Sequence, residues 1–289
     1  MEVLGEEKEK EYIEILNRYR IDLVNTHYSF FGSAIAYQKG IPVISVLHSI
    51  YSWYPGKILD EFRSGDKYVS KYIAVSREVA SFSKYRFNID QKRLQVIPDG
   101  IDIDRFEGEE IPEFSVRKNL GLHEDDFIFL HVGAINPAKM HNLLVAVMRE
   151  ISKTHPKVKL LCIGQVLNGE YYQFIQKKIE EYHLDQYMKL IGFVENPGAY
   201  YQSADAFVLP SLIEGWGIAT LDAMYHGLPL ILTRVGGAEE LIEDRDIGIL
   251  IDNCCLEVHQ LTASDWDYYS HLDFPSNAPQ LIEAMLEIY

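Results

Sequence analysis

The amino-acid sequence predicts an α/β protein built on doubly wound, parallel sheets. Short apolar runs of strand length alternate along the whole chain with amphipathic segments of helical period. The apolar runs are continuous, as expected for parallel strands that are buried on both faces. Repeated alternation of strand and helix indicates that helices cover both sides of each sheet.

The predicted strands are the apolar runs at residues 22–26, 41–47, 72–75, 94–97, 127–132, 158–163, 189–191, 206–209, 229–233 and 248–251. The predicted helices are the amphipathic segments at residues 6–19, 77–85, 139–154, 170–182, 218–226 and 279–289. Between residues 98 and 112 this pattern stops in a run of acids, prolines and glycines, which is typical of a connection between domains. We therefore expect two Rossmann-like lobes, an N-lobe at residues 1–103 and a C-lobe at residues 104–289. The predicted C-lobe has six strands, a complete set for a Rossmann-like lobe. The predicted N-lobe has only four strands, which is few for such a lobe.

Composition and charge exclude several classes of protein. Hydrophobic residues make up 47% and charged residues 24% of the chain, which is ordinary for a globular protein. A disordered chain, a collagen-like fibre and a coiled-coil rod are thereby excluded. The formal net charge is −16 and the basic residues do not cluster, so we expect no nucleic-acid partner.

The sequence also carries information on location. Three cysteines are too few for a disulfide framework, so a reducing, cytoplasmic location is expected. The first residues are charged and lack the apolar core of a signal peptide. Because each apolar run is far shorter than the roughly 20 residues of a membrane span, we expect no transmembrane segment. Association with a membrane would then be peripheral, and the acidic net charge gives it little support.

The densest candidate for chemistry follows the predicted strand at residues 206–209. A glycine-containing turn at residues 215–217 leads into a helix that starts near Ile218. Backbone N–H groups at the start of a helix favour an anion, and glycines allow a phosphate to approach. Glu214 precedes the turn and Asp222 lies inside the helix. Carboxylates suit hydroxyl groups better than a phosphate, so this segment predicts a ligand that has both phosphate and sugar hydroxyls.

The spacing of Glu214 and Asp222, with seven residues between them, resembles the E-x7-E signature of the retaining group 1 (family four) glycosyltransferases. Flanking segments resemble that family too: ADAFVLPS before the pair, GLPLILT and GGAEE after it, VIPDGID between the lobes, and IAVS and GFV elsewhere. The resemblance runs from about Asp22 to Asp252. It implies the GT-B fold, with an acceptor-side N-lobe and a C-lobe that binds the nucleotide sugar.

The resemblance implies a role for each matching residue. Glu214 would contact the donor sugar, and Asp222, one methylene shorter than the usual glutamate, would hold the ribose. Lys139 matches the lysine of the family's G-R-x4-K-G loop and would neutralise the leaving diphosphate. Ala134 stands in place of the arginine of that loop and Met140 in place of its second glycine. Loss of the arginine removes one of the cations that would neutralise the negative charge of the leaving diphosphate.

Further donor-binding residues are implied around this centre. They are Gly133, Asn136, Gly164, Val194, Gly215, Trp216, Gly217, Ile218, Gly236, Gly237 and Glu240. Gly236 and Gly237 have an alternative role in turn geometry alone. In the N-lobe, His48 resembles the histidine that faces the transferred sugar, and it completes a catalytic set with Lys139 and Glu214.

Residues expected on the acceptor side follow the first two predicted strands. They are His27, Tyr51, Trp53 and Tyr54, and packing inside the N-lobe is the alternative role for each. We expect no metal site, because no pair of histidines or cysteines has the spacing of zinc ligands.

The activity implied by the resemblance is transfer of a hexosyl group from a nucleotide sugar to an acceptor hydroxyl, with retention of configuration. The donor is expected to be linked to UDP or GDP, with no other cofactor, and the acceptor to be a carbohydrate, a lipid-linked molecule or a protein. Compared with the family, the N-lobe lacks its glycine-rich loop and its first two or three strand–helix units. The alternative is a nucleotide-sugar-binding or scaffolding subunit without turnover, whose N-lobe a protein partner would complete.

Overall fold

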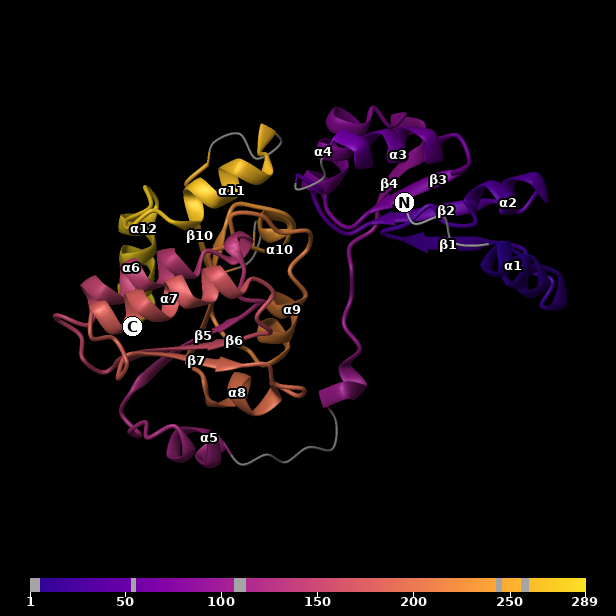
Figure 1. Cartoon of the computed structure of the whole chain (residues 1–289). Helices are drawn as coiled ribbons and strands as arrows, with labels where there is room; N and C mark the ends of the chain where they lie inside the picture. The colour runs from indigo at the N-terminus through magenta and orange to yellow at the C-terminus, as the bar shows by residue number, and fades with distance from the viewer. Residues whose placement is uncertain (1–5, 53–55, 107–112, 243–245, 256–259) are drawn as a thin grey trace. The chain divides into compact units, whose positions relative to one another are not determined.

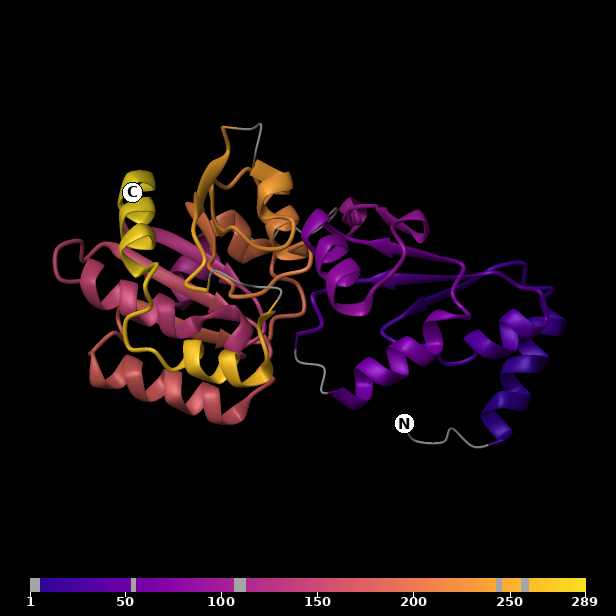
Figure 2. The same cartoon turned by 90° about the horizontal axis from the view of Figure 1, so that it is seen from above.

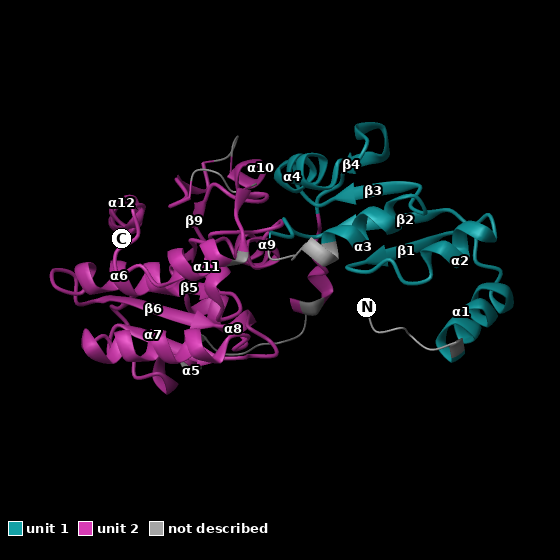
Figure 3. Cartoon of the chain, turned by 45° about the horizontal axis from the view of Figure 1, so that its top comes forward, with its two compact units in different colours: residues 1–98 teal, residues 99–289 magenta. Residues whose placement is uncertain are grey.

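The structure, a computed structural model, describes the chain except for residues 1–5, 53–55, 107–112, 243–245 and 256–259 (Figure 1). Each half of the chain has its own parallel sheet with helices packed against it (Figure 1, Figure 2). The two compact units are Met1–Pro98, called unit 1, and Asp99–Tyr289, called unit 2 (Figure 3). The predicted α/β class with two Rossmann-like lobes is confirmed.

Unit 1 is a parallel sheet of four strands in chain order. The strands are β1 (Val24–His27), β2 (Val43–Leu47), β3 (Lys71–Ala74) and β4 (Leu94–Val96). The helices are α1 (Glu6–Arg18), α2 (Ser33–Gln38), α3 (Gly56–Asp66) and α4 (Arg77–Phe87), with a 3₁₀ turn η1 at Gln91–Arg93. α3 and α4 lie side by side over the sheet (Figure 1). Because the strands are parallel, their carboxyl ends share one edge.

Aromatic side chains fill the core of unit 1 between its sheet and helices. Phe62 of α3 stacks on Phe87 of α4, with ring centroids 3.9 Å apart, and Tyr72 of β3 is fully buried next to Phe62. The Tyr72 hydroxyl donates to the Asp66 carboxylate at 2.9 Å, and Arg93 pairs with the same carboxylate at 3.0 Å. Burial raises the pKa of Tyr72, so the phenol remains a hydrogen-bond donor.

Unit 2 is a parallel sheet of six strands in the order β10-β9-β8-β5-β6-β7. The strands are β5 (Phe127–Val132), β6 (Val158–Ile163), β7 (Met188–Gly192), β8 (Ala206–Leu209), β9 (Leu230–Thr233) and β10 (Gly248–Ile251). The interior strands β8 and β9 are buried along their whole length, which explains their continuous apolar sequences. The order of the strands along the chain reverses between β5 and β8, and this is the switch point of the sheet.

Helices cover both faces of the unit 2 sheet. They are α5 (Glu113–Asn119), α6 (His141–Ile151), α7 (Gly169–Glu181), α8 (Gly198–Ser203), α9 (Ile218–Tyr225), α10 (Ala238–Ile242), α11 (Ala263–Ser270) and α12 (Ala278–Ile288). Two 3₁₀ turns are also present, η2 (Ile103–Phe106) before α5 and η3 (Pro137–Lys139) between β5 and α6. α6 packs between α7 and α12, and α8 lies on the opposite face of the sheet (Figure 1).

Each predicted strand is present, but the prediction of helices was incomplete. Helices α2, α3, α5, α8, α10 and α11 were not predicted, because most are too short to show a helical period. The predicted helix at residues 139–154 was wrong at its start. Met140 adopts left-handed backbone angles (φ 51°, ψ 46°), so η3 ends there and α6 begins only at His141.

Candidate functional site

The candidate site lies at the switch point of unit 2, where ligands bind in doubly wound folds. The segments that follow β5 and β8 meet there, because the Leu212 N–H donates to the Ala138 carbonyl oxygen at 2.9 Å. This contact brings Lys139 of η3 next to Glu214, which precedes α9. The Lys139 ammonium donates to the Glu214 carboxylate, and the two side chains are 18% and 17% exposed. They form a half-buried ion pair at the carboxyl edge of the sheet.

The Glu214 carboxylate is held by two further donors. The Ser211 hydroxyl donates to the oxygen that faces Lys139, at 3.5 Å, and the Gly215 N–H donates to the other oxygen at 3.1 Å. A cation, a hydroxyl and an amide therefore favour the ionised carboxylate and fix its direction. Sequence analysis assigned no role to Ser211, although it ends the ADAFVLPS segment that matched the family.

A pair of buried histidines lies next to this ion pair. His131 of β5 and His141, the first residue of α6, are both fully buried, with ring centroids 4.8 Å apart. Burial lowers the pKa of His131 to about 4 and holds the pKa of His141 well below its usual value. Both rings are therefore neutral near pH 7. Sequence reasoning missed this pair, and the only signal was a titratable residue inside the apolar run FIFLHV.

His131 also marks the place where two strands separate. β5 and β8 pair only at Phe129 with Ala206 and at Leu130 with Phe207. One residue further on, His131 Nδ1 lies 3.0 Å from the Val208 carbonyl oxygen. Since the neutral ring can donate only through an N–H, Nδ1 carries the proton. A side-chain hydrogen bond thus continues the link between the strands where the backbone pairing ends.

The start of α9 offers backbone N–H groups next to Lys139. Gly217 is the N-cap and has a φ of +91°, which favours glycine over other residues. Within the described part of the chain, no side chain caps this helix. The first N–H groups of a helix have no intrahelical acceptor and, with the helix dipole, attract an anion. Asp222 lies further along α9 and is 6% exposed. The helix start and the lysine can together hold a phosphate.

The turn after β9 packs directly on the turn after β8. A Cβ at Gly237 would overlap the Trp216 indole, and a Cβ at Gly236 would lie 2.7 Å from the Gly215 carbonyl oxygen. Trp216 is 7% exposed, so most of its ring is a packing surface between the two turns. This close approach favours the alternative role of the two glycines in turn geometry. It also favours packing over ligand contact for the indole.

The loops after β5 and β6 lie side by side at the same edge. A Cβ at Gly164 would overlap the carbonyl oxygen of Gly133. Asn136 is the N-cap of η3, and its Oδ1 is buried without a hydrogen-bond partner among the described residues. Met140 is 1% exposed and has a φ of 51°. This left-handed conformation explains why the matching family loop has a glycine at the position of Met140. It lowers the stability by roughly 1 kcal/mol when another residue adopts it.

Two further predicted residues, Val194 and Glu240, lie on other elements of unit 2 than the ion pair. Val194 follows β7 and is half-buried, next to Phe193, which is 72% exposed. Glu240 is half-buried in the first turn of α10. Arg234, which follows β9, pairs with Glu239 at 2.9 Å, so its cation is engaged by an acid of α10.

Three of the predicted N-lobe residues, His27, His48 and Tyr51, lie at or just after the carboxyl ends of β1 and β2. His27 ends β1 and His48 follows β2, and His27 Nδ1 lies 2.6 Å from His48 Nε2. Tyr51 is 3% exposed, and its hydroxyl accepts a hydrogen bond from the His48 N–H at 3.1 Å. This placement favours the packing role for Tyr51. Trp53 and Tyr54 lie outside the described residues.

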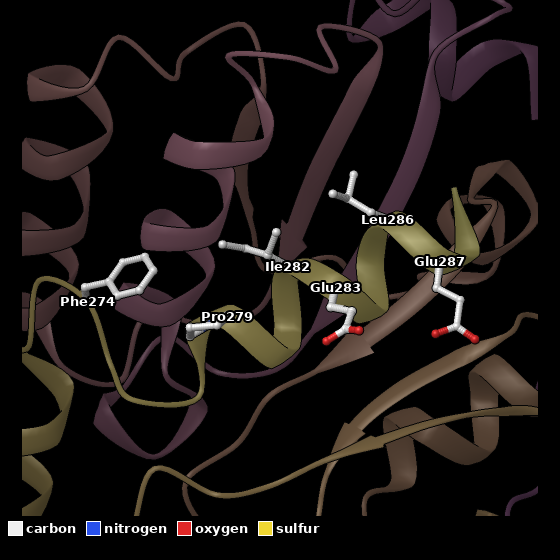
Figure 4. A pocket seen from close by; sticks show the side chains of 6 residues that line it. All are labelled: Phe274, Pro279, Ile282, Glu283, Leu286 and Glu287. Atoms are coloured by element: carbon white, nitrogen blue, oxygen red, sulfur yellow. The ribbon is translucent and has the colours of Figure 1, made fainter.

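A separate groove of about 660 Å³ lies along α12 (Figure 4). Its lining consists of Phe274, Pro279, Ile282, Glu283, Leu286 and Glu287. Figure 4 shows apolar side chains on one side of the helix and two glutamates on the other. The groove contains none of the predicted site residues, and its acidic rim is unsuited to an anionic ligand.

Within the described ranges, no group of three or more His, Cys, Asp or Glu side chains is placed to hold a metal ion. Among the described helices, none combines the length and the apolar character that a membrane-crossing segment needs.

Family models match both halves of the chain. The model of glycosyl transferases group 1 matches residues 113–263, which include all the predicted donor-binding residues of unit 2. The model of glycosyltransferase family 4 matches residues 10–105, which include His27 and His48.

Individual proteins are similar to most of the chain. Alpha-monoglucosyldiacylglycerol synthase from Acholeplasma laidlawii is 25% identical over 84% of this chain, which spans 66% of that relative's length. A glycosyltransferase from Rickettsia africae is similar over 100% of this chain and 78% of its own, with 18% identity and a TM-score of 0.75. The Anabaena protein HepE, solved with UDP and glucose, is similar over 96% of this chain and 78% of its own, with 20% identity and a TM-score of 0.73. These structures share the two-domain, GT-B-like fold, and the group 1 model covers more than half of the residues. The chain therefore belongs to the group 1 glycosyl transferases.

Proposed function

We propose that this chain transfers a hexosyl group from a nucleotide sugar to an acceptor hydroxyl with retention of anomeric configuration. The observation that carries this proposal is the Lys139–Glu214 ion pair next to the uncapped start of α9, at the switch point of unit 2. A cation and a helix start suit a diphosphate, and a fixed carboxylate suits the hydroxyls of a sugar. Membership of the group 1 family supports the same reaction.

In the proposed reaction, the bond between the anomeric carbon and the diphosphate lengthens toward an oxocarbenium-like state. Negative charge grows on the leaving phosphate, and Lys139 and the amides at residues 215–218 stabilise that charge. The acceptor hydroxyl attacks from the same face, and a leaving phosphate oxygen takes its proton. Glu214 orients the sugar hydroxyls and Asp222 holds the ribose, and neither is a covalent nucleophile. His48 of unit 1 is the third member of the proposed catalytic set, as the family resemblance implies.

The proposed donor is a UDP- or GDP-linked sugar, which serves as co-substrate without a further cofactor. The HepE complex with UDP and glucose supports a uridine nucleotide. Lys139 and the start of α9 supply positive charge to the leaving group, so the reaction as proposed does not depend on a metal. The proposed acceptor is a carbohydrate, a lipid-linked molecule or a protein. The name of the diacylglycerol synthase supports a lipid and, with it, a cytoplasmic enzyme that binds membranes peripherally.

A second candidate is a subunit that binds a nucleotide sugar without turning it over. Ala134 leaves the loop after β5 without the family's arginine, and Lys139 already has an acid as partner. The sheet of unit 1 has four strands, against six in unit 2, and a protein partner that completes unit 1 is part of this proposal.

Titration calorimetry with UDP, GDP and their sugars, followed by a nucleotide-release assay with and without an acceptor extract, distinguishes the candidates. We expect the wild type to bind one nucleotide and to release it from the matching sugar donor. Glu214→Gln should lose release, whereas Glu283→Gln, on the outer side of α12, should match the wild type. Binding without release under every condition would support the second candidate. Absence of nucleotide binding would contradict both.

A further inference from the structure

A small cavity lies next to Glu214, where the turns that follow β8 and β9 meet. Five of the side chains that line it carry a polar atom: Ser211, Glu214, Trp216, Thr220 and Thr233. Apolar side chains of β8, β9 and α10 form most of the remaining wall. The volume of the cavity is about 10 Å³. This volume has room for one water molecule, and buried water is found where a cavity of that size offers it several polar partners.

Two of the polar atoms in this wall are buried without a partner. Trp216 Nε1 and Thr233 Oγ1 are both shielded from solvent, and neither makes a hydrogen bond to another described residue. Trp216 is 7% exposed and Thr233 is 1% exposed. An indole N–H can only donate, whereas a threonine hydroxyl both donates and accepts. Because a buried polar atom without a partner destabilises the fold, both atoms need a partner inside the protein.

Packing accounts for only one side of the Trp216 indole. A Cβ at Gly237 would lie 2.1 Å from Cε3 and 2.5 Å from Cζ3, so this side of the ring packs on the turn after β9. Nε1 is on the opposite side of the indole. Gly237 does not line the cavity, so the part of the ring that lines it differs from the part that packs on Gly237. The side with the N–H is therefore the one that a water in the cavity can reach.

The cavity also reaches the carboxylate of the candidate site. The Ser211 hydroxyl is 3.5 Å from the Glu214 oxygen that faces Lys139, which is at the long end of hydrogen-bond distances. An ionised carboxylate accepts several hydrogen bonds, so Glu214 has capacity for a further donor. A water that accepts from an indole N–H keeps both of its own protons to donate.

We propose that this cavity is a binding site for one ordered water, which accepts from the Trp216 N–H and donates to the Thr233 hydroxyl and the Glu214 carboxylate. Thr233 is then a positioning residue, because through the water it holds the turn at residues 215–217 and the direction of the carboxylate. Its role in turnover rests on the proposed function, in which Glu214 orients the sugar of the donor. A carboxylate that is already oriented needs no reorganisation during the reaction, so loss of the Thr233 hydroxyl lowers kcat.

Two substitutions at Thr233 separate the hydroxyl from the shape of the side chain. Thr233→Val keeps the shape and removes the hydroxyl, whereas Thr233→Ser keeps the hydroxyl. We expect Thr233→Val to lower kcat about threefold to tenfold, the effect of one hydrogen bond, and Thr233→Ser to keep most of the activity. Thr154→Val makes the same chemical change at an exposed position that follows α6, and this matched control should equal the wild type.

The NMR signal of the Trp216 indole N–H reports the water without any need for turnover. The chain has three tryptophans, and Trp216→Phe identifies this signal. In the wild type and in Thr233→Ser, the signal should show a nuclear Overhauser effect to a long-lived water. In Thr233→Val this effect should be lost, and the proton should shift upfield because the N–H loses its acceptor.

The outcomes separate the hydration site from the proposed function. Absence of the water contact in the folded wild type would overturn the inference and leave the proposed function intact. An unchanged indole signal in Thr233→Val would also overturn it, because the hydroxyl would then not hold the water. Loss of the water with an unchanged kcat would refute the positioning role of Thr233. A wild type that binds nucleotide but never releases it would instead count against the proposed enzyme, and the NMR experiment would still decide whether the water is bound.

Discussion

Lys139 and Glu214 neutralise each other across the switch point of unit 2. One follows β5 and the other follows β8, 75 residues later in the chain. The cation assigned to the diphosphate and the carboxylate assigned to the sugar are thus already in contact. A bound donor has to share Lys139 with Glu214, so substitutions at the two positions have opposite effects on a nucleotide without sugar.

Lys139→Met should weaken UDP binding, because the diphosphate loses a charge-assisted hydrogen bond. Such a bond contributes about 1.5–3 kcal/mol, which corresponds to an affinity roughly ten- to a hundredfold lower. Glu214→Gln should leave UDP affinity equal or higher, because Lys139 is released to the phosphates, while sugar transfer falls. Titration calorimetry measures the first effect and the release assay the second. Equal weakening of UDP binding by both substitutions would contradict this arrangement.

The double variant Lys139→Met, Glu214→Gln is the control for folding. Removing one partner leaves a half-buried charge alone, whereas removing both does not. The double variant should therefore be more stable toward urea than Lys139→Met, although it binds UDP just as weakly. If the double variant is less stable than both Lys139→Met and Glu214→Gln, the ion pair itself holds the loops together.

The buried histidines make unit 2 sensitive to acid. The pKa of His131 is about 4 in the folded chain and close to 6.5 when unfolded, so the unfolded state binds the proton more readily between these values. The free energy of unfolding should therefore decrease as the pH falls from about 6.5 to about 4. Between pH 7 and pH 5 the loss is about 2 kcal/mol for His131 alone. The lowered pKa of His141 adds to it in the same direction.

Urea unfolding at pH 7 and pH 5 tests this acid sensitivity. His131→Gln removes the titrating ring, so its stability should change less between the two pH values than that of the wild type. The variant will be less stable at pH 7, because the ring is fully buried, and only the difference between pH values is informative. A wild type that is equally stable at both values would refute the account.

Met140 offers a test of backbone strain. Met140→Ala and Met140→Gly remove the same buried side chain, but only glycine adopts a φ of 51° freely. Met140→Gly should therefore be more stable than Met140→Ala by about 1 kcal/mol. At Lys177, an exposed position inside α7, the order should be reversed, because glycine weakens an ordinary helix by about 1 kcal/mol relative to alanine. Chemical denaturation of the four variants measures both differences.

Gly237→Ala should damage the donor site through Trp216. The new methyl group would overlap the indole, and moving the indole shifts the turn at residues 215–217 that leads into α9. We expect a loss of about 1–3 kcal/mol in stability and a weaker affinity for UDP. Gly169→Ala is the control, because a Cβ there meets nothing within 4 Å. If UDP binds normally to Gly237→Ala, the turn after β9 does not support the site.

The strands could be predicted because burial on both faces leaves a local trace. A run such as AFVL in β8 is apolar at each position, so this strand can be predicted from its own sequence without knowledge of the residues that pack on it. Helices such as α10, with five residues, leave no comparable trace, because one turn is shorter than the period that identifies a helix. The wrong start of α6 has a different cause. Met140 adopts left-handed backbone angles, which cannot be predicted from its residue type.

The candidate site could be predicted where its residues lie close together in the sequence. Glu214, Gly217 and Asp222 lie in one strand–turn–helix segment, so their spacing carried the prediction. The contact between His27 and His48 depends on the register of two strands, and the partners of His131 depend on where β5 and β8 separate. Such relationships arise from tertiary structure, and a single sequence does not display them.

The hydrogen bond between His131 and the Val208 carbonyl oxygen has a consequence for the protein without a ligand. Because the ring links the ends of β5 and β8 beyond their last backbone pair, it fixes the separation of these strand ends whether or not a ligand is bound. If the proposed nucleotide site lies at these strand ends, binding energy is therefore not consumed in separating the strands.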